Sequence, residues 1–372
     1  MMRSKQQLLE LIRSSLWGSE ADINLFEKGV DWAEVLQLAK EQTLLGVVSA
    51  AIERLPLSLH PSRGDRLRLH QKVALNRIYR GHQVEILAEM IEMVKRAGVE
   101  KPVLLKGLGA GLNYPDPGLR QCGDIDLYVG DRNYIAVCEF IRKELSLKEE
   151  KNYSEHHFTF TFRGNIVEIH RYATAPNSVA FRSGEFIEWS MEQLEGEELR
   201  EVSIEGVRVY LPPYNFDFIY IFYHTWRHFL TGGVGLRQMC DWACYTSALY
   251  NNIDREEIMR LVTLFRLERA VALFASIAVR ALGVAPEKIF GYDKIDDQLY
   301  QSAMERIWSR GNFGYYNVDN QRRTKGVVAR KYLGTIAMAR DMKYLMRIDW
   351  RYALRFYSMS FVRSVRLAMK GL

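Results

Sequence analysis

The sequence predicts an α+β fold in which a small mixed β-sheet is flanked by helical regions on its N-terminal and C-terminal sides. Apolar residues recur at three- and four-residue spacing from residue 4 to about residue 97, and again after residue 213. Between these regions the pattern changes to short runs rich in β-branched and aromatic residues. The 372 residues exceed the roughly 250–300 that one hydrophobic core usually holds, so we expect two or three domains.

The N-terminal helical region is expected over residues 1–97. Its helical runs are LLELIRSSLW, WAEVLQLAKEQTLLGVVSAAIERL and ILAEMIEMVKRAG, and Pro56 interrupts them. Charged residues are scattered among the first apolar ones, so we expect no signal peptide. The longest apolar stretches fall short of the ~18–20 residues of a membrane span. Four cysteines without a CxxC motif fit a reducing cytoplasm.

The α/β core is expected over residues 98–212. Strands are predicted in VLLKG, DIDLYV, HHFTFTF and NIVEIHRY, and a helix in YIAVCEFIRKEL. The run EVSIEGVRVYLP, near residues 201–212, alternates on both sides of Glu205-Gly206. This pattern is typical of a β-hairpin, which we expect to close the core.

The C-terminal region, residues 213–372, is again helical and ends in a basic tail. Residues 306–372 contain 15 Lys or Arg and only 3 Asp, so this segment carries +12 of a chain whose net charge is +6. Such a tail favours an anionic partner, either nucleic acid, a membrane surface or a phosphate ligand, although a solvated or packing face explains it equally well. Its basic stripe, interleaved with aromatic residues, comprises Arg340, Lys343, Arg347, Arg351 and Arg355.

The most informative segment is DIDLYV at 124–129. Side chains alternate along a strand, so Asp124 and Asp126 share one face while Ile125 and Leu127 point into the core. Two carboxylates on one face repel each other unless a cation lies between them. Hard oxygen ligands suit Mg²⁺, so the pair predicts a metal site.

Two neighbouring features extend this site. Upstream, the strand VLLK ends at Lys106-Gly107, where glycine permits a tight turn and lets backbone N–H groups approach a phosphate. Downstream, IVEIH places Glu168 and His170 on one face of another strand, which adds a third carboxylate. The GLGAG run at 107–111 lacks the third glycine of a dinucleotide-binding fingerprint, so we reject that fold.

Together these elements resemble a known family, the bacterial uncharacterised nucleotidyltransferases of the DNA polymerase β-like superfamily. Its members carry LKG, an Arg shortly before DIDLLV, a strand with an acidic residue followed by His, a helical HxxxH and then LRQxxD. The resemblance covers roughly residues 40–300. The matching elements here are LLKG at 104–107, Arg120, DIDLYV at 124–129, VEIH at 167–170, His224, His228, Leu236, Arg237 and Asp241.

The resemblance implies transfer of a nucleoside monophosphate from an NTP to a hydroxyl-bearing acceptor by two-metal-ion catalysis with Mg²⁺ or Mn²⁺. It places the metal ions on Asp124, Asp126 and Glu168, and lets Glu168 help to deprotonate the acceptor. It places the triphosphate on Lys106, Gly107 and Arg120.

Several other polar residues are candidates to touch the acceptor or to orient a carboxylate: His170, His157, His224, His228, Arg237 and Asp241. Of the neighbours His156 and His157, we expect one to face the site and the other solvent. His224 and His228 share a helical face and could ligate zinc with Cys240, Asp241 and Cys244. Packing or lining a cleft is favoured, because the HExxH signature is absent.

The sequence therefore favours a cytoplasmic nucleotidyltransferase, or one held peripherally at a membrane by its basic tail. The acceptor is a small molecule, a glycan precursor or a protein. The alternative function is a catalytically inactive module that binds nucleotide or nucleic acid on the same fold. The three clustered carboxylates favour catalysis, because a pure binder has little use for them beside a polyphosphate.

Overall fold

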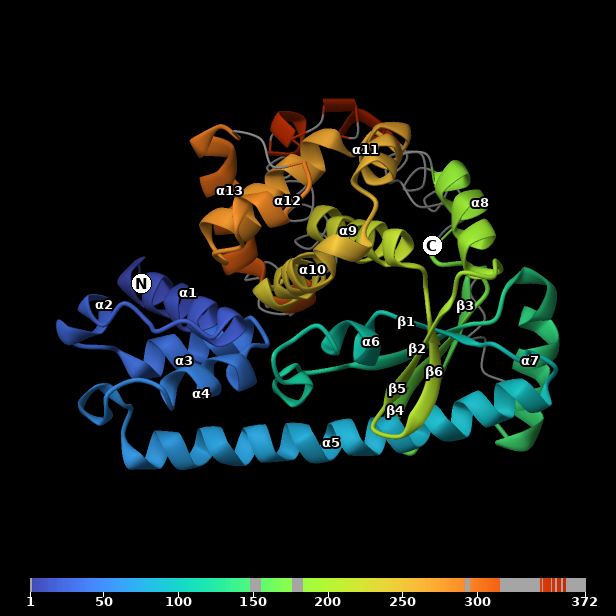
Figure 1. The fold of residues 1–372 in the computed structure, drawn as a ribbon, viewed down its shortest axis with the longest axis horizontal. Helices are drawn as coiled ribbons and strands as arrows, with labels where there is room; N and C mark the ends of the chain where they lie inside the picture. The colour runs from blue at the N-terminus through green and yellow to red at the C-terminus, as the bar shows by residue number, and fades with distance from the viewer. Residues whose placement is uncertain are drawn as a thin grey trace, which may run out of the picture.

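The computed structural model describes residues 2–147, 155–175, 183–291 and 295–314, and some positions between 342 and 358. It confirms the α+β fold, because a six-stranded mixed sheet lies among many helices (Figure 1). Among the described residues, no helix combines the length and the apolar character needed to cross a bilayer.

The N-terminal helices precede the sheet and end in one long helix. They are α1 (Met2–Trp17), α2 (Asn24–Glu27), α3 (Trp32–Glu41), α4 (Leu45–Ile52), the 3₁₀ turn η1 (Leu57–Leu59) and α5 (Arg63–Arg96). Ser62 caps α5 by accepting a hydrogen bond from the Asp65 backbone N–H. Helix α5 runs beneath both α4 and the sheet, and its second half is buried against the sheet (Figure 1). This half therefore packs with the α/β core, although the sequence placed it in the preceding region.

The sheet has the strand order β3-β4-β2-β1-β6-β5. Strand β2 lies at its centre, parallel to β4 and antiparallel to β1. The strands are β1 (Val103–Leu105), β2 (Asp124–Tyr128), β3 (His157–Phe162), β4 (Asn165–His170), β5 (Arg200–Ile204) and β6 (Val207–Leu211). The helical elements around them are α6 (Gly107–Gly111), the 3₁₀ turn η2 (Pro117–Leu119), α7 (Asp131–Glu144) and α8 (Ser183–Leu194).

The predicted hairpin is confirmed at the edge of this sheet. Strands β5 and β6 pair antiparallel, from Ile204 opposite Val207 to Arg200 opposite Leu211. The two turn residues, Glu205 and Gly206, both have positive φ, 49° and 88°. Two-residue hairpin turns whose central residues have positive φ match the twist of the strands, which explains why Gly206 stands there.

The C-terminal helices pack over the opposite face of the sheet and against the N-terminal helices (Figure 1). They are α9 (Tyr214–Thr231), α10 (Leu236–Leu249), η3 (Tyr250–Asn252), α11 (Arg255–Leu264), α12 (Glu268–Arg280), η4 (Pro286–Lys288), α13 (Asp297–Arg310) and η5 (Asn312–Gly314). Arg13 donates a 2.9 Å hydrogen bond to the Ala281 carbonyl, and Trp17 donates one of 2.5 Å to that of Leu282. The two helical regions, far apart in sequence, thus share one hydrophobic core.

The basic tail lies only partly within the described residues. The described positions between 342 and 358 are helical, and Leu345, Ile348 and Ala353 are buried in the shared core. Arg340 and Lys343 lie outside the described residues. The exposed side chains on this segment include three basic and four apolar ones: Arg347, Arg351, Arg355, Met342, Met346, Trp350 and Leu354.

Candidate active site

Strand β2 positions the two predicted aspartates on one face of the sheet. The residues that alternate with them, Ile125 and Leu127, are fully buried in the core with residues of α5 and α7, as expected from the alternation. Asp126 is fully buried on the other face, toward the C-terminal helices, whereas Asp124 begins the strand and is partly exposed. The two carboxylates therefore occupy different depths of the same site.

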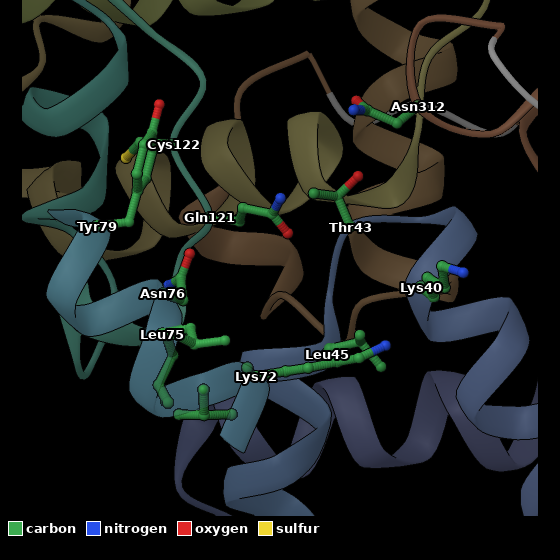
Figure 2. A pocket seen from close by; sticks show the side chains of 13 residues that line it. Lys40, Thr43, Leu45, Lys72, Leu75, Asn76, Tyr79, Gln121, Cys122 and Asn312 are labelled. Carbon is green, nitrogen blue, oxygen red and sulfur yellow. The ribbon is translucent and has the colours of Figure 1, made fainter. Parts of the chain in front are cut away.

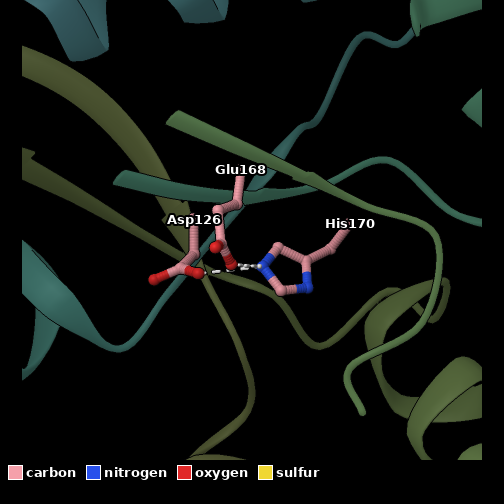
Figure 3. Close-up of side chains that lie close together, drawn as sticks. All are labelled: Asp126, Glu168 and His170. Carbon is pink, nitrogen blue, oxygen red and sulfur yellow. Dashed lines mark hydrogen bonds and ion pairs between the residues drawn. The ribbon is translucent and has the colours of Figure 1, made fainter. Parts of the chain in front are cut away.

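Strand β4 brings Glu168 and His170 beside Asp126. In the parallel register Asp126 lies opposite Glu168, and Tyr128 lies opposite His170. The His170 Nε2 atom is 2.8 Å from Asp126 Oδ1 and 3.2 Å from Glu168 Oε2 (Figure 3). Among the described residues, Asp126, Glu168 and His170 form the one group of side chains whose ligand atoms lie close enough to hold a metal ion, within 4.8 Å of one another. Asp124 is outside this group.

Lys106 contributes a second positive charge to the cluster. Its Nζ atom lies 3.1 Å from Asp126 Oδ1, the same oxygen that His170 contacts. Oδ2 of Asp126 is buried and has no hydrogen-bond partner among the described residues. Asp126 is therefore paired with two protein cations, Lys106 and His170, rather than standing as a bare carboxylate beside Asp124.

The charges of this cluster shift its pKa values strongly. Burial alone would lower the pKa of His170, but hydrogen bonds to Asp126 and Glu168 outweigh it and raise the pKa to about 9. Burial alone would raise the pKa of Glu168, but the hydrogen bond and charge of His170, with the charge of Lys106, lower it to about 2. Burial opposes the charge of Lys106 as well, yet Asp126 raises its pKa. Near neutral pH, the cluster thus holds ionised Glu168, protonated His170 and charged Lys106.

The predicted Lys-Gly turn connects β1 to α6 at the edge of this cluster. Lys106 and Gly107 both have positive φ, 40° and 46°, a conformation that favours glycine. A Cβ atom at Gly107 would lie 3.3 Å from the Asp124 carbonyl oxygen, so the turn approaches β2 closely. Lys106 is the non-glycine residue in this strained turn, and the turn directs its ammonium toward Asp126.

A narrow cleft of about 50 Å³ opens between this turn and the C-terminal helices. Lys106, Gly107 and Asp124 line it from the sheet side, and His224 and Arg237 from α9 and α10. A cleft of this size holds an ion or water molecules but not a whole nucleotide. Arg237 donates a 3.1 Å hydrogen bond to the Gln121 carbonyl and has no carboxylate partner among the described residues.

Arg120, expected at the phosphates, has a different partner in the structure. Its Nε and Nη2 atoms bind the two oxygens of Asp241 at 2.7 and 2.8 Å, and Tyr114 donates a 2.7 Å hydrogen bond to the same carboxylate. Arg120 and Asp241 are both more than nine-tenths buried. Arg120 also lines the cleft beside Lys106 and Gly107, and a phosphate contact by Arg120 stays a prediction. The pair itself joins the loop before β2 to helix α10.

His224 and His228 lie on one face of α9 with Tyr220, which the sequence reasoning missed. The rings of the two histidines contact each other edge to face, with 4.5 Å between centroids. Burial lowers the pKa of both, to about 3 for His228. The Tyr220 hydroxyl is buried without a hydrogen-bond partner in the described structure. Tyr220, His224 and His228 are spaced four residues apart, and this spacing is the sequence signal that predicts Tyr220 on the same helix face as the two histidines.

The zinc alternative at these histidines gains no support from the described residues, because His224 and His228 belong to no group of ligand atoms close enough to hold a metal. Cys240 and Cys244 are buried free thiols.

His157 reaches the carboxylate cluster from the neighbouring strand. Its Nε2 atom lies 4.0 Å from Glu168 Oε1, and burial lowers its pKa. Its Nδ1 atom lies 2.6 Å from His156 Nε2. His156 does not face solvent freely, as one of the pair was expected to do, because it is half-buried against His157.

The structure thus brings carboxylates of two adjacent strands beside the Lys-Gly turn. The profile of the family described as "Uncharacterised nucleotidyltransferase" matches residues 28–283, and the chain belongs to this family. No curated protein and no solved structure matches the chain.

Proposed function

We propose that the chain transfers a nucleoside monophosphate from an NTP to a hydroxyl-bearing acceptor and releases pyrophosphate. The observation that carries this proposal is the arrangement of Asp126. One of its oxygens is held by Lys106 and His170, and the other is buried without a partner among the described residues. A buried, unpartnered carboxylate oxygen is costly and is expected to bind a cation.

The donor set fits a hard divalent cation, Mg²⁺ or Mn²⁺. Asp126 and Glu168 offer carboxylate oxygens within 4.8 Å of each other, and Asp124, two residues before Asp126, offers another that lines the cleft. His170 is protonated near neutral pH, so we assign it to holding the two carboxylates in place rather than to binding metal. When bound, such cations would lower the pKa of the acceptor hydroxyl and balance the charge of pyrophosphate.

The positive groups of the cleft fit the phosphates. We assign the phosphate contacts to Lys106, to the backbone at Gly107 and to Arg237, whose guanidinium lines the cleft without a carboxylate partner in the described structure. The cleft is too small for the nucleoside, which would extend toward solvent.

The reaction forms a bond between the acceptor oxygen and the α-phosphorus and breaks the bond to the pyrophosphate oxygen. The acceptor proton needs a base. A carboxylate whose pKa is about 2 accepts a proton poorly, so Glu168 suits metal binding better than proton transfer. His157, whose lowered pKa leaves its imidazole neutral, lies beside Glu168 and is better suited to take this proton.

A pyrophosphate-release assay tests the proposal with each NTP, Mg²⁺ or Mn²⁺, and pools of hydroxyl-bearing small molecules, glycan precursors and proteins. Release that depends on an acceptor and is lost in Asp126→Asn supports it. The alternative function, an inactive nucleotide-binding module, predicts NTP binding without release in any pool.

The basic tail is a candidate for a second contact, separate from the nucleotide site. We propose that it binds an anionic surface, such as a membrane to which the protein is peripheral. Supporting this, the exposed apolar side chains at 342, 346, 350 and 354 recur every four residues beside three exposed arginines. Such a face is typical of helices that lie in a membrane interface.

A further inference from the structure

A second, larger cavity lies on the other side of the segment that leads to Asp124. It has a volume of about 760 Å³, within the range of small-molecule sites. Figure 2 shows its lining, which comes from α3, Thr43 and α4, from the first half of α5, from residues 119, 121 and 122 before β2, and from Asn312. No predicted site residue lines it.

The lining is basic and partly apolar. Lys40 and Lys72 both line the cavity, and no Asp or Glu does. Neither lysine forms a salt bridge within the described part of the chain. Leu45, Val73 and Leu75 supply an apolar surface beside them. Both lysines are exposed and have no ion-pair partner among the described residues, and two such charges next to an apolar wall favour a ligand with an anionic group and an apolar body.

The cavity and the catalytic cleft are separated by the thickness of one chain segment. Leu119, Gln121 and Cys122 line the cavity, whereas Gly123 and Asp124, the next two residues, line the cleft. Tyr79 spans this boundary, because it lines the cavity while its hydroxyl donates a 3.5 Å hydrogen bond to the Gly123 carbonyl. A ligand atom next to the Tyr79 hydroxyl therefore lies near Gly123, which lines the cleft.

The cavity wall contains one strained residue, Thr43, and one close backbone approach, at Gly46. Thr43 has a φ of 60°, although β-branched residues rarely adopt positive φ. Its hydroxyl has no hydrogen-bond partner among the described residues, and Thr43 lines the cavity. At Gly46 an added Cβ would lie 2.3 Å from the Leu119 carbonyl oxygen, so glycine lets α4 contact the segment before β2. Strained residues concentrate at functional sites.

We propose that this cavity binds the acceptor of the transfer reaction, and that the acceptor is an anionic molecule with an apolar body. Lys40 and Lys72 lie on the side of the cavity away from Tyr79 and Cys122 (Figure 2). The anionic group binds the two lysines, the apolar body lies on Leu45 and Leu75, and the hydroxyl points past Tyr79 toward Asp124. The role as acceptor rests on the proposed function, whereas the ligand class rests on the cavity alone.

Thermal-shift titration tests the ligand class without NTP or metal. The probes are octyl phosphate and octanoate, with inorganic phosphate and octyl glucoside as controls for charge alone and apolar surface alone. We expect the anionic octyl probes to raise the melting temperature at concentrations at least about tenfold below those of either control. A rise in melting temperature with octyl phosphate but not with octanoate would support the proposal and identify the anionic group as a phosphate. Equal responses to octyl glucoside would overturn the proposal.

Matched variants locate the binding. Lys40→Gln/Lys72→Gln should lose the response to octyl phosphate, whereas Lys28→Gln/Lys288→Gln, which removes the same charge from two exposed lysines outside the cavity, should keep it. If both double variants respond like wild type, the ligand binds elsewhere and the proposal fails. Melting of each variant without probe shows whether it is folded.

The same probe separates this inference from the proposed function. Asp126→Asn should still bind octyl phosphate, because Asp126 does not line the cavity. A hydroxyl-bearing analogue, 8-hydroxyoctyl phosphate, should release pyrophosphate from an NTP with wild type, and Lys40→Gln/Lys72→Gln should raise its KM at least about tenfold with kcat little changed. Binding of the analogue without transfer under conditions where another acceptor reacts would overturn the acceptor role. Transfer with no acceptor at all would count against the proposed function instead.

Discussion

The ammonium of Lys106 lies 3.1 Å from Oδ1 of Asp126, the oxygen that His170 also contacts at 2.8 Å. Two protein cations thus share one carboxylate oxygen. The other oxygen of Asp126 is buried without a partner among the described residues, and the carboxylate of Glu168 lies beside Asp126. The cluster is therefore held together before a nucleotide arrives, which reduces the rearrangement that catalysis would require.

The first prediction contrasts the two aspartates in EDTA. Asp126→Asn removes the carboxylate that pairs with buried Lys106 and leaves protonated His170 with Glu168 alone, so we expect it to lower the free energy of unfolding by about 3–5 kcal/mol. Asp124→Asn removes a partly exposed carboxylate that has no salt bridge among the described residues, and should change stability by less than about 1 kcal/mol. Urea denaturation measures both. Equal effects of the two substitutions would contradict the assigned pairing.

The second prediction is a pH dependence of metal-free stability. The pKa of His170 is raised to about 9 from an ordinary value of 6.5, so its contribution is fully present below pH 6.5 and lost as the pH rises to 9. The shift corresponds to about 3 kcal/mol for this buried group. His170→Asn should be less stable near pH 6 and should show a flatter profile between pH 6.5 and 9. A profile as steep as that of wild type would show that another group titrates.

The third prediction concerns the buried ion pair between Arg120 and Asp241. Both are buried and bind each other through two hydrogen bonds, so Asp241→Asn should lower the free energy of unfolding by about 3–5 kcal/mol. Arg260→Gln serves as the control, because Arg260 forms an exposed pair with Glu257 and its loss should cost less than about 1 kcal/mol. If Asp241→Asn lowers the free energy of unfolding no more than the control does, and NTP binding falls, Arg120 contacts phosphate rather than stabilising the fold through Asp241.

The fourth prediction concerns the tail. Because Leu345, Ile348 and Ala353 are buried in the core, deleting the tail would disturb the fold, and charge substitutions are the cleaner test. Arg347→Gln/Arg351→Gln/Arg355→Gln should weaken sedimentation with vesicles rich in phosphatidylserine, by about 1 kcal/mol per charge, and leave NTP affinity unchanged. Binding of wild type to neutral vesicles to the same extent would contradict an electrostatic contact.

Much of the fold was predictable because local pattern determines it. The alternation in DIDLYV places Ile125 and Leu127 in the core, and the Glu205-Gly206 turn fixes the final hairpin. The packing of α1 on the chain near Leu282 was not predictable, because contacts between distant segments leave no periodic signal. For the same reason α5 was assigned to one region although it packs with two cores.

The placement of Asp126 beside Glu168 was predictable, whereas Asp124 lies outside the group that could hold a metal, and the partners of the carboxylates were less predictable. Strand register places Glu168 opposite Asp126, as the shared face suggested. The sequence could not show that Arg120 is bound by Asp241 or that Lys106 is bound by Asp126, because pairing between side chains depends on how the helices and the sheet meet. Tyr79, Tyr220 and the cavity behind Gln121 were missed for the same reason.

Binding of Mn²⁺ tests the central claim most directly. Electron paramagnetic resonance titration counts free Mn²⁺ in the presence of α,β-methylene-ATP, which cannot be cleaved between the α- and β-phosphates. We predict that wild type binds Mn²⁺ together with the analogue, and that Asp126→Asn/Glu168→Gln, shown by its melting to be folded, loses at least about tenfold in affinity, or 1.4 kcal/mol. Undiminished Mn²⁺ binding by this folded double variant would show that these carboxylates do not hold the metal.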